Sequence, residues 1–295
     1  MLTAAGGAER CRIEFRTKCL ATFVDPATDE PRVACGCRRK VNIYDPVAGG
    51  TALVVIDVGD YVQALAVFMD PVTGEPRLAC GFRDRKVHIF DLVAGGEALL
   101  VIEALACALA VFTGPATGAL RLACGTSFCG KGDVRVFDPL VGGKALIVIE
   151  VGGEMNALEV FADPATGAPR LACASGEKVL VVDPVAGGDA LLVLDIGSEM
   201  WALAVFKEPA TSAPRIACGS SDGVRVFDAV SGGEALLVLD AGSEVYALHI
   251  FEDLATGALR LACASDDNKV RVFDPIAGGE ALVVLDASAY ELIAF

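Results

Sequence analysis

The chain has 295 residues, of which 54% are hydrophobic, and its formal net charge is −15 at pH 7. This hydrophobic content is sufficient for a sizeable core in one domain or two. A strongly negative chain is repelled by a phosphate backbone, so the charge argues against a protein that binds nucleic acid.

The mean hydropathy of +0.55 requires a test for a membrane-spanning segment. The most apolar window, Ala98–Phe112, is interrupted by Glu103 and is shorter than the roughly 20 residues of a spanning helix. We therefore expect no membrane insertion. The N-terminal segment Met1–Arg10 has neither a basic region nor a long apolar run, so we expect no secretory signal and an intracellular protein, in the cytoplasm by default.

A segment of about 45 residues recurs six times, approximately at 19–63, 64–107, 108–156, 157–201, 202–246 and 247–286. In chain order, each copy contains an A-L-x-[VI]-F run, a D-P-A-T-G type turn, an R-[LVI]-A-C run, a V-x-[VI]-[FYV]-D run, a Gly-Gly turn and an A-L-[LIV]-V-[IL]-[DE] run. These short runs are rich in Val, Ile, Leu and Phe and are bounded by Gly, Pro, Asp or Ser, which is typical of strands. No run keeps a helical period. Each copy therefore predicts four strands, A to D.

The predicted strands fall at equivalent places in all six copies. Strand A is expected at 20–23, 65–68, 109–112, 158–161, 203–206 and 248–251. Strand B ends on Cys35, Cys80, Cys124, Cys173, Cys218 and Cys263. Strand C ends on Asp45, Asp91, Asp138, Asp183, Asp228 and Asp274, and strand D follows each Gly-Gly pair, from Gly49-Gly50 to Gly278-Gly279.

Four short strands in this order form a small sheet with two apolar faces. Such a sheet cannot bury both faces by itself, but packing each copy against the next and closing the circle does so. We therefore predict an all-β fold in which residues 1–295 form a single β-propeller domain with four-stranded antiparallel blades.

The two ends of the chain carry additional strand-like segments. Residues 9–23 align with residues 98–112 without a gap, which places a segment like strand D at 9–14, and residues 290–295 align with 246–251, which places a segment like strand A at 290–295. The six copies favour six blades, with the terminal strands closing the ring. Seven blades stay open as an alternative, in which the terminal segments are the remnants of a seventh blade without strands B and C.

Strands B to D resemble the signature of WD-repeat propellers. Residues Ala262–Asp274 read ACASDDNKVRVFD and residues Ala217–Asp228 read ACGSSDGVRVFD, whereas blades of that family typically run A-S-G-S-x-D-x-T-V-[RK]-[VL]-W-D. The resemblance covers nearly the whole chain and implies the propeller fold. The D-P-A-T-G turns are also loosely similar to those of quinoprotein propellers, but that family needs a tryptophan in each blade and this chain has only Trp201.

Two features of the WD-repeat family are absent. The Trp of its Trp-Asp pair is Phe, Tyr or Val here, and the Gly-His pair before strand A is missing. In the family that His joins a hydrogen-bond network with an Asp of the B–C turn, to which Asp84, Asp222 and Asp267 correspond. Because the His partner is missing, we expect the blades to be held mainly by apolar packing.

Six of the 11 cysteines occupy one equivalent position in strand B and are interpreted as packing residues, whereas Cys37 and Cys129, in B–C turns, are expected to be the most exposed thiols. Equivalent strand-B positions on neighbouring blades are expected to lie beyond the roughly 4.4–6.8 Å Cα separation of a disulfide. Cysteine is also a small residue that is often buried, so reduced, buried thiols are expected, in keeping with an intracellular location. The close pairs Cys35/Cys37 and Cys124/Cys129 lack the spacing of a zinc site, and we expect no metal site and no cofactor.

No catalytic arrangement is recognisable in the sequence. His88 and His249 each lie in a predicted strand, without a nucleophile and an orienting acid at a recognisable spacing. Glu159 interrupts an apolar strand A and is interpreted as structural. The Gly-Gly pairs are hairpin turns rather than phosphate-binding loops. We therefore expect a protein that is not an enzyme.

The copies differ mainly in the B–C and D–A turns, which share one face in WD-repeat propellers and form the usual docking surface there. Trp, Tyr, Met and Arg are enriched at interface hot spots. We therefore predict a partner site on this face with an aromatic half and a basic half. Its candidate residues are Trp201, Tyr246, Tyr61, Met155, Met200, Arg38, Arg39, Arg83, Arg85 and Phe128.

The basic half lies in the least acidic part of the chain. Residues 1–100 hold 12 Lys and Arg against 13 Asp and Glu, whereas the other residues hold 12 against 26. This half would suit an acidic peptide or a phosphopeptide. The alternative for the aromatic half is that residues at the strand starts merely fill the centre of the ring.

The function predicted from these features is a non-catalytic protein–protein interaction scaffold, with other proteins or peptides as partners. Two alternatives stay open. One is a structural subunit of a larger assembly whose terminal strands pair with another chain, since the sequence does not settle the oligomeric state. The other is a propeller enzyme or small-ligand binder, which would need titratable groups at the channel mouth, where Glu159 and His249 are the candidates.

Overall fold

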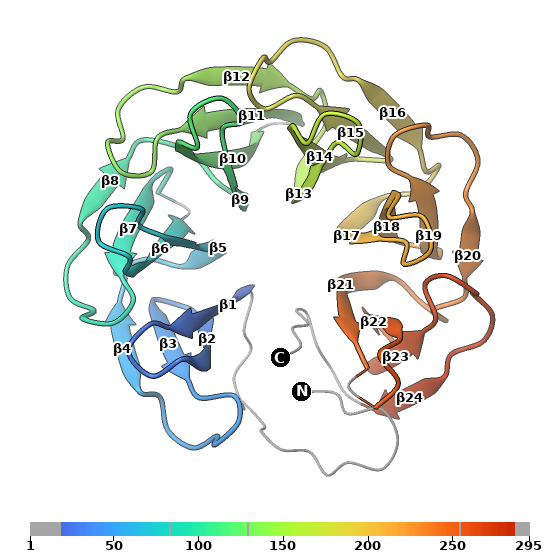
Figure 1. Ribbon diagram of the computed structural model, residues 1–295, viewed down its shortest axis with the longest axis horizontal. Helices are drawn as coiled ribbons and strands as arrows, with labels where there is room; N and C mark the ends of the chain where they lie inside the picture. The colour runs from blue at the N-terminus through green and yellow to red at the C-terminus, as the bar shows by residue number, and fades with distance from the viewer. Residues whose placement is uncertain (1–18, 83, 129, 254, 287–295) are drawn as a thin grey trace.

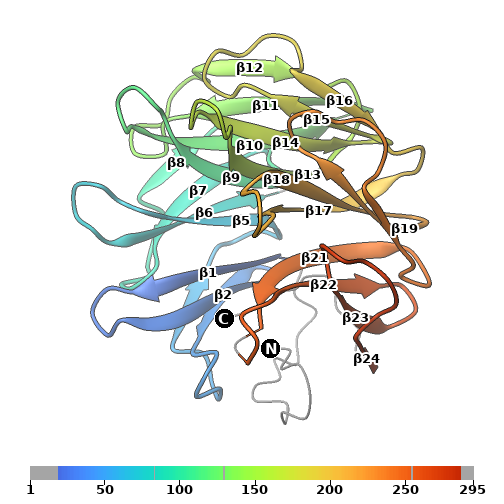
Figure 2. The same ribbon diagram turned by 45° about the vertical axis from the view of Figure 1, so that its right-hand side comes forward.

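The computed structural model describes residues 19–82, 84–128, 130–253 and 255–286. In this part of the chain, six four-stranded antiparallel sheets are arranged in a ring and no residue is helical (Figures 1 and 2). The predicted six-bladed, all-β propeller is confirmed. No helix long and apolar enough to cross a membrane occurs among the described residues. The segments predicted at 9–14 and 290–295 lie outside those residues, so ring closure by the terminal strands stays a prediction.

Each blade consists of four consecutive strands, ordered from the centre of the ring to its outside (Figure 1). The first three blades comprise β1 (Cys19–Asp25), β2 (Glu30–Cys37), β3 (Lys40–Tyr44) and β4 (Val54–Asp57); β5 (Val62–Met69), β6 (Pro76–Phe82), β7 (Val87–Asp91) and β8 (Leu100–Ile102); and β9 (Ala108–Thr113), β10 (Leu120–Phe128), β11 (Lys131–Phe137) and β12 (Ile147–Glu150). The last three comprise β13 (Met155–Ala162), β14 (Pro169–Ser175), β15 (Lys178–Val182) and β16 (Leu192–Asp195); β17 (Met200–Lys207), β18 (Pro214–Ser220), β19 (Gly223–Asp228) and β20 (Leu237–Leu239); and β21 (Val245–Glu252), β22 (Leu259–Ser265), β23 (Lys269–Phe273) and β24 (Val283–Asp286).

The strands at position B are longer than the apolar runs that predicted them. Strand β14 continues beyond Cys173 to Ser175, which pairs with Lys178 of β15. In blade 3, β10 continues to Phe128 and makes the longest B–C hairpin of the ring with β11. Pairing with strand C therefore extends strand B beyond the apolar run and into the turn.

Apolar side chains fill the spaces between neighbouring blades. In one such cluster, Val134 and Ile149 of blade 3 pack with Leu158 and Leu171 of blade 4. The six strand-B cysteines are fully buried, which confirms their interpretation as packing residues. Burial raises the pKa of the Cys173 thiol to about 12, so the reactive thiolate is strongly disfavoured there.

An ion-pair cluster at the other end of the strands was not predicted. Arg170, at the start of β14, lies 2.9 Å from Asp183 at the end of strand C and 3.3 Å from Asp163 in the A–B turn. Asp183 also accepts hydrogen bonds from the backbone N–H groups of Val185 and Ala186. One largely buried guanidinium therefore connects strands B and C with the A–B and C–D turns. The equivalent pairs are Arg32–Asp45, Arg77–Asp91, Arg121–Asp138, Arg215–Asp228 and Arg260–Asp274.

The expectation that the blades are held mainly by apolar packing needs a correction at the B–C turn. Asp267 accepts hydrogen bonds from Ser265 at 2.6 Å and from Arg271 at 2.6 Å. The Arg271 guanidinium, above all, holds the pKa of the Asp267 carboxyl well below its usual range. An arginine on strand C therefore supplies the partner for which the sequence offered no His. The same arrangement recurs in blade 5 with Ser220, Asp222 and Arg225.

Candidate partner-binding face

The B–C and D–A turns lie on one face of the ring, which we call the turn face. They share it because they hydrogen-bond to one another between neighbouring blades. The N–H of Val62, at the start of blade 2, donates to the carbonyl of Arg38 in the B–C turn of blade 1 at 2.9 Å. The N–H of Asp266 in a B–C turn similarly donates to the carbonyl of Glu244 in the preceding D–A turn at 2.9 Å.

A β-bulge marks the start of the inner strand in four blades. The register shifts between Val62 and Ala64, Met155 and Ala157, Met200 and Ala202, and Val245 and Ala247. The extra residues are Gln63, Asn156, Trp201 and Tyr246, which are four of the positions at which the copies differ. A bulge leaves its extra residue out of the ladder and re-aims its side chain. The bulges therefore place the variable side chains at the centre of the turn face.

Trp201 and Tyr246 contact each other across the interface of blades 5 and 6. Their ring centroids are 5.6 Å apart and the rings meet edge to face at 66°, an arrangement that stabilises aromatic pairs. The Tyr246 hydroxyl donates to Glu244 at 2.8 Å, and this hydrogen bond is the main reason why the pKa of Tyr246 rises to about 12. Both rings are half-buried. The two rings therefore form a fixed aromatic surface beside the carboxylate of Glu244.

Two variable positions connect neighbouring blades. The Cys107 thiol lies 3.1 Å from the carbonyl oxygen of Met155, and Asn156 Nδ2 donates to the carbonyl of Met200 at 2.7 Å. These bonds join the starts of consecutive inner strands, from blade 3 to blade 4 and from blade 4 to blade 5. At these two positions the side chains have a structural role, because they connect neighbouring blades, in addition to any contact with a partner.

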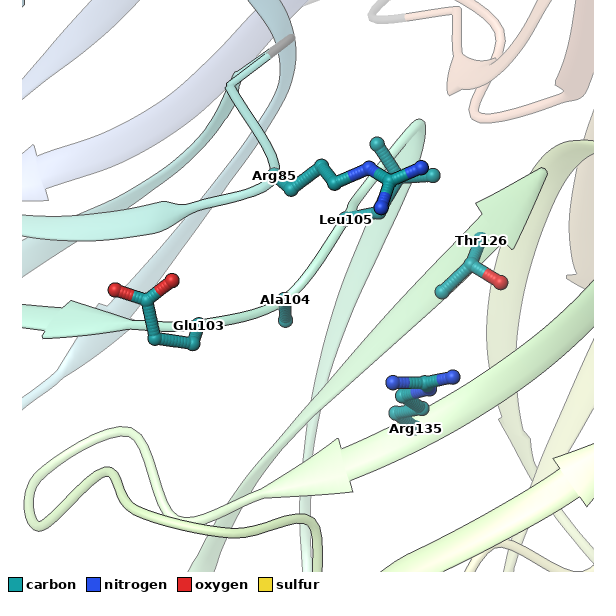
Figure 3. Close-up of a pocket in the computed structure, with 6 residues that line it drawn as sticks. All are labelled: Arg85, Glu103, Ala104, Leu105, Thr126 and Arg135. Carbon is teal, nitrogen blue, oxygen red and sulfur yellow. The ribbon is translucent and has the colours of Figure 1, made fainter. Parts of the chain in front are cut away.

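Two adjoining cavities open on the turn face between blades 2, 3 and 4. The larger, of about 500 Å³, is lined by Gln63, Arg85, Leu105, Cys107, Ser127, Met155 and Asn156. The smaller, of about 310 Å³, is lined by Arg85, Glu103, Ala104, Leu105, Thr126 and Arg135 (Figure 3). Arg85 and Leu105 belong to both cavities. The cavities had no signal in the sequence beyond the variability of the residues around them.

The arginines of the predicted basic half have different surroundings. Arg39 donates through Nε to the carbonyl of Gly59 at 2.6 Å, so its guanidinium holds the following D–A turn. Arg38 and Arg85 are exposed residues of B–C turns with φ of 54° and 66°. Arg83 lies outside the described residues.

The remaining candidates of the predicted partner site divide between surface and interior. Tyr61 is 51% exposed on the turn face. Met155 and Met200 are 1% and 0% exposed and pack between blades, so Met155 reaches only the floor of the larger cavity and Met200 is not available to a partner. Phe128 ends β10, and its side chain lies outside the described part of the chain.

The titratable residues of the inner strands lie apart from the cavities. Glu159 of β13 and His249 of β21 occupy a position that is alanine in the other four blades, and β17 lies between their strands (Figure 1). Burial raises the pKa of Glu159 to about 7 and lowers the pKa of His249. Within the described residues, no three His, Cys, Asp or Glu side chains are grouped so that they could hold a metal ion.

No protein-family model matches the chain, and no curated protein matches it by sequence. Its fold is similar to that of crystal structures of BBS1N in complex with ARL6DN. For the crystal soaked with lead, the TM-score is 0.71 at 16% identity, over 95% of this chain and 85% of that chain. For the crystal soaked with mercury, the TM-score is 0.73 at 16% identity, over 99% and 88%. At this identity the likeness shows the β-propeller fold alone, and membership of the WD-repeat family stays a prediction.

Proposed function

We propose that the chain is a non-catalytic scaffold that binds another protein or a peptide on its turn face. The observation that carries the proposal is the convergence of the positions at which the copies differ. Gln63, Cys107 and Asn156 line one cavity, and Trp201 packs on Tyr246 on the same face. The strand residues repeat because every blade must pack on the next, whereas a face on which the repeats diverge can be specific for one ligand.

The chemistry of the turn face suits a protein partner. Half-buried aromatic rings supply contact area at a small cost in conformational entropy, and Trp, Tyr and Arg dominate the binding energy of many interfaces. BBS1N, which shares the fold, is solved in complex with another protein, ARL6DN, and this supports a protein partner for a propeller of this kind.

We propose that the chain is not catalytic because the titratable groups of its inner strands lie apart from one another. Glu159 and His249 lie on different blades, and neither lines the described cavities. We also propose an intracellular location. It is supported by the burial of Cys80, Cys173 and Cys218, whose thiols pack in apolar surroundings.

The proposal is tested by mapping the surface that a partner contacts. A partner is first found by proximity labelling with the full chain and then purified. Its affinity is measured by titration calorimetry for the wild-type chain, for a Trp201→Ala/Tyr246→Ala double variant, and for a Val72→Ala/Val141→Ala control. The control positions are 87% and 75% exposed in the A–B and C–D turns of the opposite face.

We expect the aromatic double variant to weaken binding by at least about tenfold, because truncation of hot-spot aromatics commonly costs about 2 kcal/mol or more. The control should bind like the wild type, and circular dichroism should show both variants folded. Loss of binding in the control with unchanged binding in the aromatic variant would place the partner on the opposite face and contradict the proposal.

A second function, as a structural subunit of a larger assembly, is favoured by one observation. All six outer strands expose a Leu or Val at alternate positions, for example Leu53 and Val55 at 56% and 52% and Leu282 and Val284 at 55% and 52%. Exposed apolar residues on edge strands favour association with other chains. Light scattering over a range of concentrations tests this function, and a strict monomer that binds its partner only through the turn face would exclude it.

A further inference from the structure

We propose that the aromatic surface formed by Trp201 and Tyr246 binds a cationic side chain of the partner, a lysine or an arginine, together with the carboxylates of Glu244 and Asp266. The inference rests on the proposed function, because the cation belongs to the protein or peptide that docks on the turn face. It goes beyond that function by naming the chemistry recognised at blades 5 and 6. It does not concern the predicted basic half, which lies on blades 1 and 2.

Two carboxylates face the hydroxyl group of Tyr246. This hydroxyl donates to Glu244 at 2.8 Å. Asp266 is held beside Glu244 by the backbone, since its N–H donates to the Glu244 carbonyl at 2.9 Å. The hydrogen bond to Glu244, burial and the charge of Asp266 together raise the pKa of Tyr246 to about 12. A phenol has one proton to donate, so it neutralises neither charge, and a cation between the two carboxylates is attracted by both.

The arginines near the aromatic surface are engaged by other carboxylates. Arg225 lies 2.7 Å from Asp222 in the B–C turn of blade 5. Arg271 lies 2.6 Å from Asp267 in the B–C turn of blade 6 and also donates to Ser265. Each guanidinium is therefore neutralised by the aspartate of its own turn. Among the described residues, no Lys or Arg makes an ion pair with the two carboxylates that face Tyr246.

The whole charge balance around the aromatic surface is negative. The B–C and D–A turns of blades 5 and 6, with the strand residues beside them, carry seven Asp and Glu against three Lys and Arg. They comprise residues 195–200, 220–225, 240–246 and 265–271. Lys269 is the third cation, and it lies opposite Asp286 in the register of β23 and β24. The adjoining turns of blade 4 add Glu154 and Glu177 against Lys178. The described neighbours therefore do not reverse the sign.

The rings can themselves take part in binding a cation. A lysine or arginine is attracted to the face of an aromatic ring, most strongly to that of tryptophan. Trp201 and Tyr246 meet edge to face at 66°, so their contact covers a face of only one ring, and both rings are half-buried. The long apolar stem of a lysine or arginine can lie along the rings while its charge reaches the carboxylates. The other described bulges carry Gln63, Asn156 and no aromatic residue, so this combination occurs at one place on the face.

A cation fits this surface better than a neutral or an acidic side chain does. A neutral apolar group would cover the rings but remove water from Glu244 and Asp266 without replacing its hydrogen bonds, which is costly for a charged group. An acidic group would be repelled by the same two carboxylates. A lysine or arginine supplies both the apolar stem and the donors.

The test is a selection of random peptides without tryptophan, displayed on phage, against the immobilised full chain in three forms. These are the wild type, Glu244→Gln/Asp266→Asn, and Glu234→Gln/Glu280→Gln as a matched control. The amides keep the oxygen that accepts the Tyr246 hydrogen bond, so the first variant removes charge with little change in shape. The control removes two exposed carboxylates from the C–D turns of the same blades, on the opposite face.

We expect the wild type and the control to select peptides with a lysine or arginine at a fixed position, and the Glu244→Gln/Asp266→Asn variant to lose this preference. In fluorescence polarisation with a selected peptide, citrulline in place of arginine, or norleucine in place of lysine, should weaken binding to the wild type by about tenfold or more, since charge-assisted bonds are lost. This arm changes only the peptide, so it does not depend on the folding of a variant. The emission of Trp201, the single tryptophan, should shift when the cationic peptide binds.

The outcomes separate this inference from the proposed function. Peptides that lose affinity in the Trp201→Ala/Tyr246→Ala variant but select no cation, or bind equally well with citrulline or norleucine, overturn the inference and leave the scaffold in place. A cationic preference that persists in Glu244→Gln/Asp266→Asn, or leaves the emission of Trp201 unchanged, overturns the site assigned to the cation. Peptides that are indifferent to every turn-face variant, or no enrichment at all, count against the proposed function and the inference together.

Discussion

Glu159 offers a quantitative test of how the blades pack. It lies on β13 at the position where four other blades carry alanine, and it is half-buried. Its neighbours two positions away on β13, Ala157 and Phe161, pack with Leu203 of blade 5. The carboxyl therefore faces an apolar interface, and burial raises the pKa of Glu159 from 4.5 to about 7.

The direction of the pH effect follows from this raised pKa. The folded chain binds the Glu159 proton more tightly than the unfolded chain does, so the contribution of this residue to stability is fully present below pH 4.5. It is lost as the pH rises to about 7, by about 1.4 kcal/mol per pH unit at most, and it stays lost above that. The upper bound is about 3 kcal/mol. Because the side chain keeps some contact with solvent, we expect about 2 kcal/mol.

Replacement of Glu159 by alanine should therefore stabilise the protein by about 2 kcal/mol at pH 8 and have little effect near pH 4.5. Urea unfolding followed by the fluorescence of Trp201, the single tryptophan, measures the free energy of unfolding at both pH values. Glu159→Gln should show the same loss of pH dependence. Glu280→Ala removes an exposed carboxylate and serves as the control, with no expected change. An equal effect of Glu159→Ala at both pH values, or destabilisation at pH 8, would refute the reasoning.

Three further substitutions test contacts between and within blades, each by the free energy of unfolding in urea. Gly81→Ala should destabilise the protein by about 1–3 kcal/mol, because a Cβ there would lie 2.7 Å from the carbonyl oxygen of Ala106. An unchanged midpoint of urea unfolding would show that the two segments can move apart without loss of stability. Arg170→Ala should lower the free energy of unfolding by about 3 kcal/mol, since two largely buried carboxylates lose their partner. A loss below about 1 kcal/mol would show that the cluster contributes no more than a surface ion pair does. Asn156→Ala should cost about 1 kcal/mol through the lost bond to the next inner strand, whereas Asn156→Asp, which lacks the donor, should cost at least as much.

Much of the fold could be predicted from the residues because it depends on local patterns. Short apolar runs with period two, bounded by Gly, Pro and Asp, specify strands and hairpins wherever they occur. Six repetitions of the same unit then require six sheets that bury one another. The burial of the strand-B cysteines followed from the same pattern, since each ends an apolar run. The ion pairs of Arg170 and its equivalents were accessible in principle, because each copy repeats an Arg at the start of strand B and an Asp at the end of strand C.

The arrangement of the turn face was decided only by the tertiary structure. Met200 is buried and Trp201 is half-buried on the face, and the register shift between Met200 and Ala202 leaves Trp201 as the extra residue of a bulge. Since side chains alternate along a strand, one extra residue reverses which of them face inward, and a local pattern does not show where that residue lies. The contact of Trp201 with Tyr246 and the cavity beside Arg85 depend on the distance between separate blades. The sequence by itself therefore determined the blades and the positions at which they differ, whereas the packing of blade on blade decided which of those positions form a site.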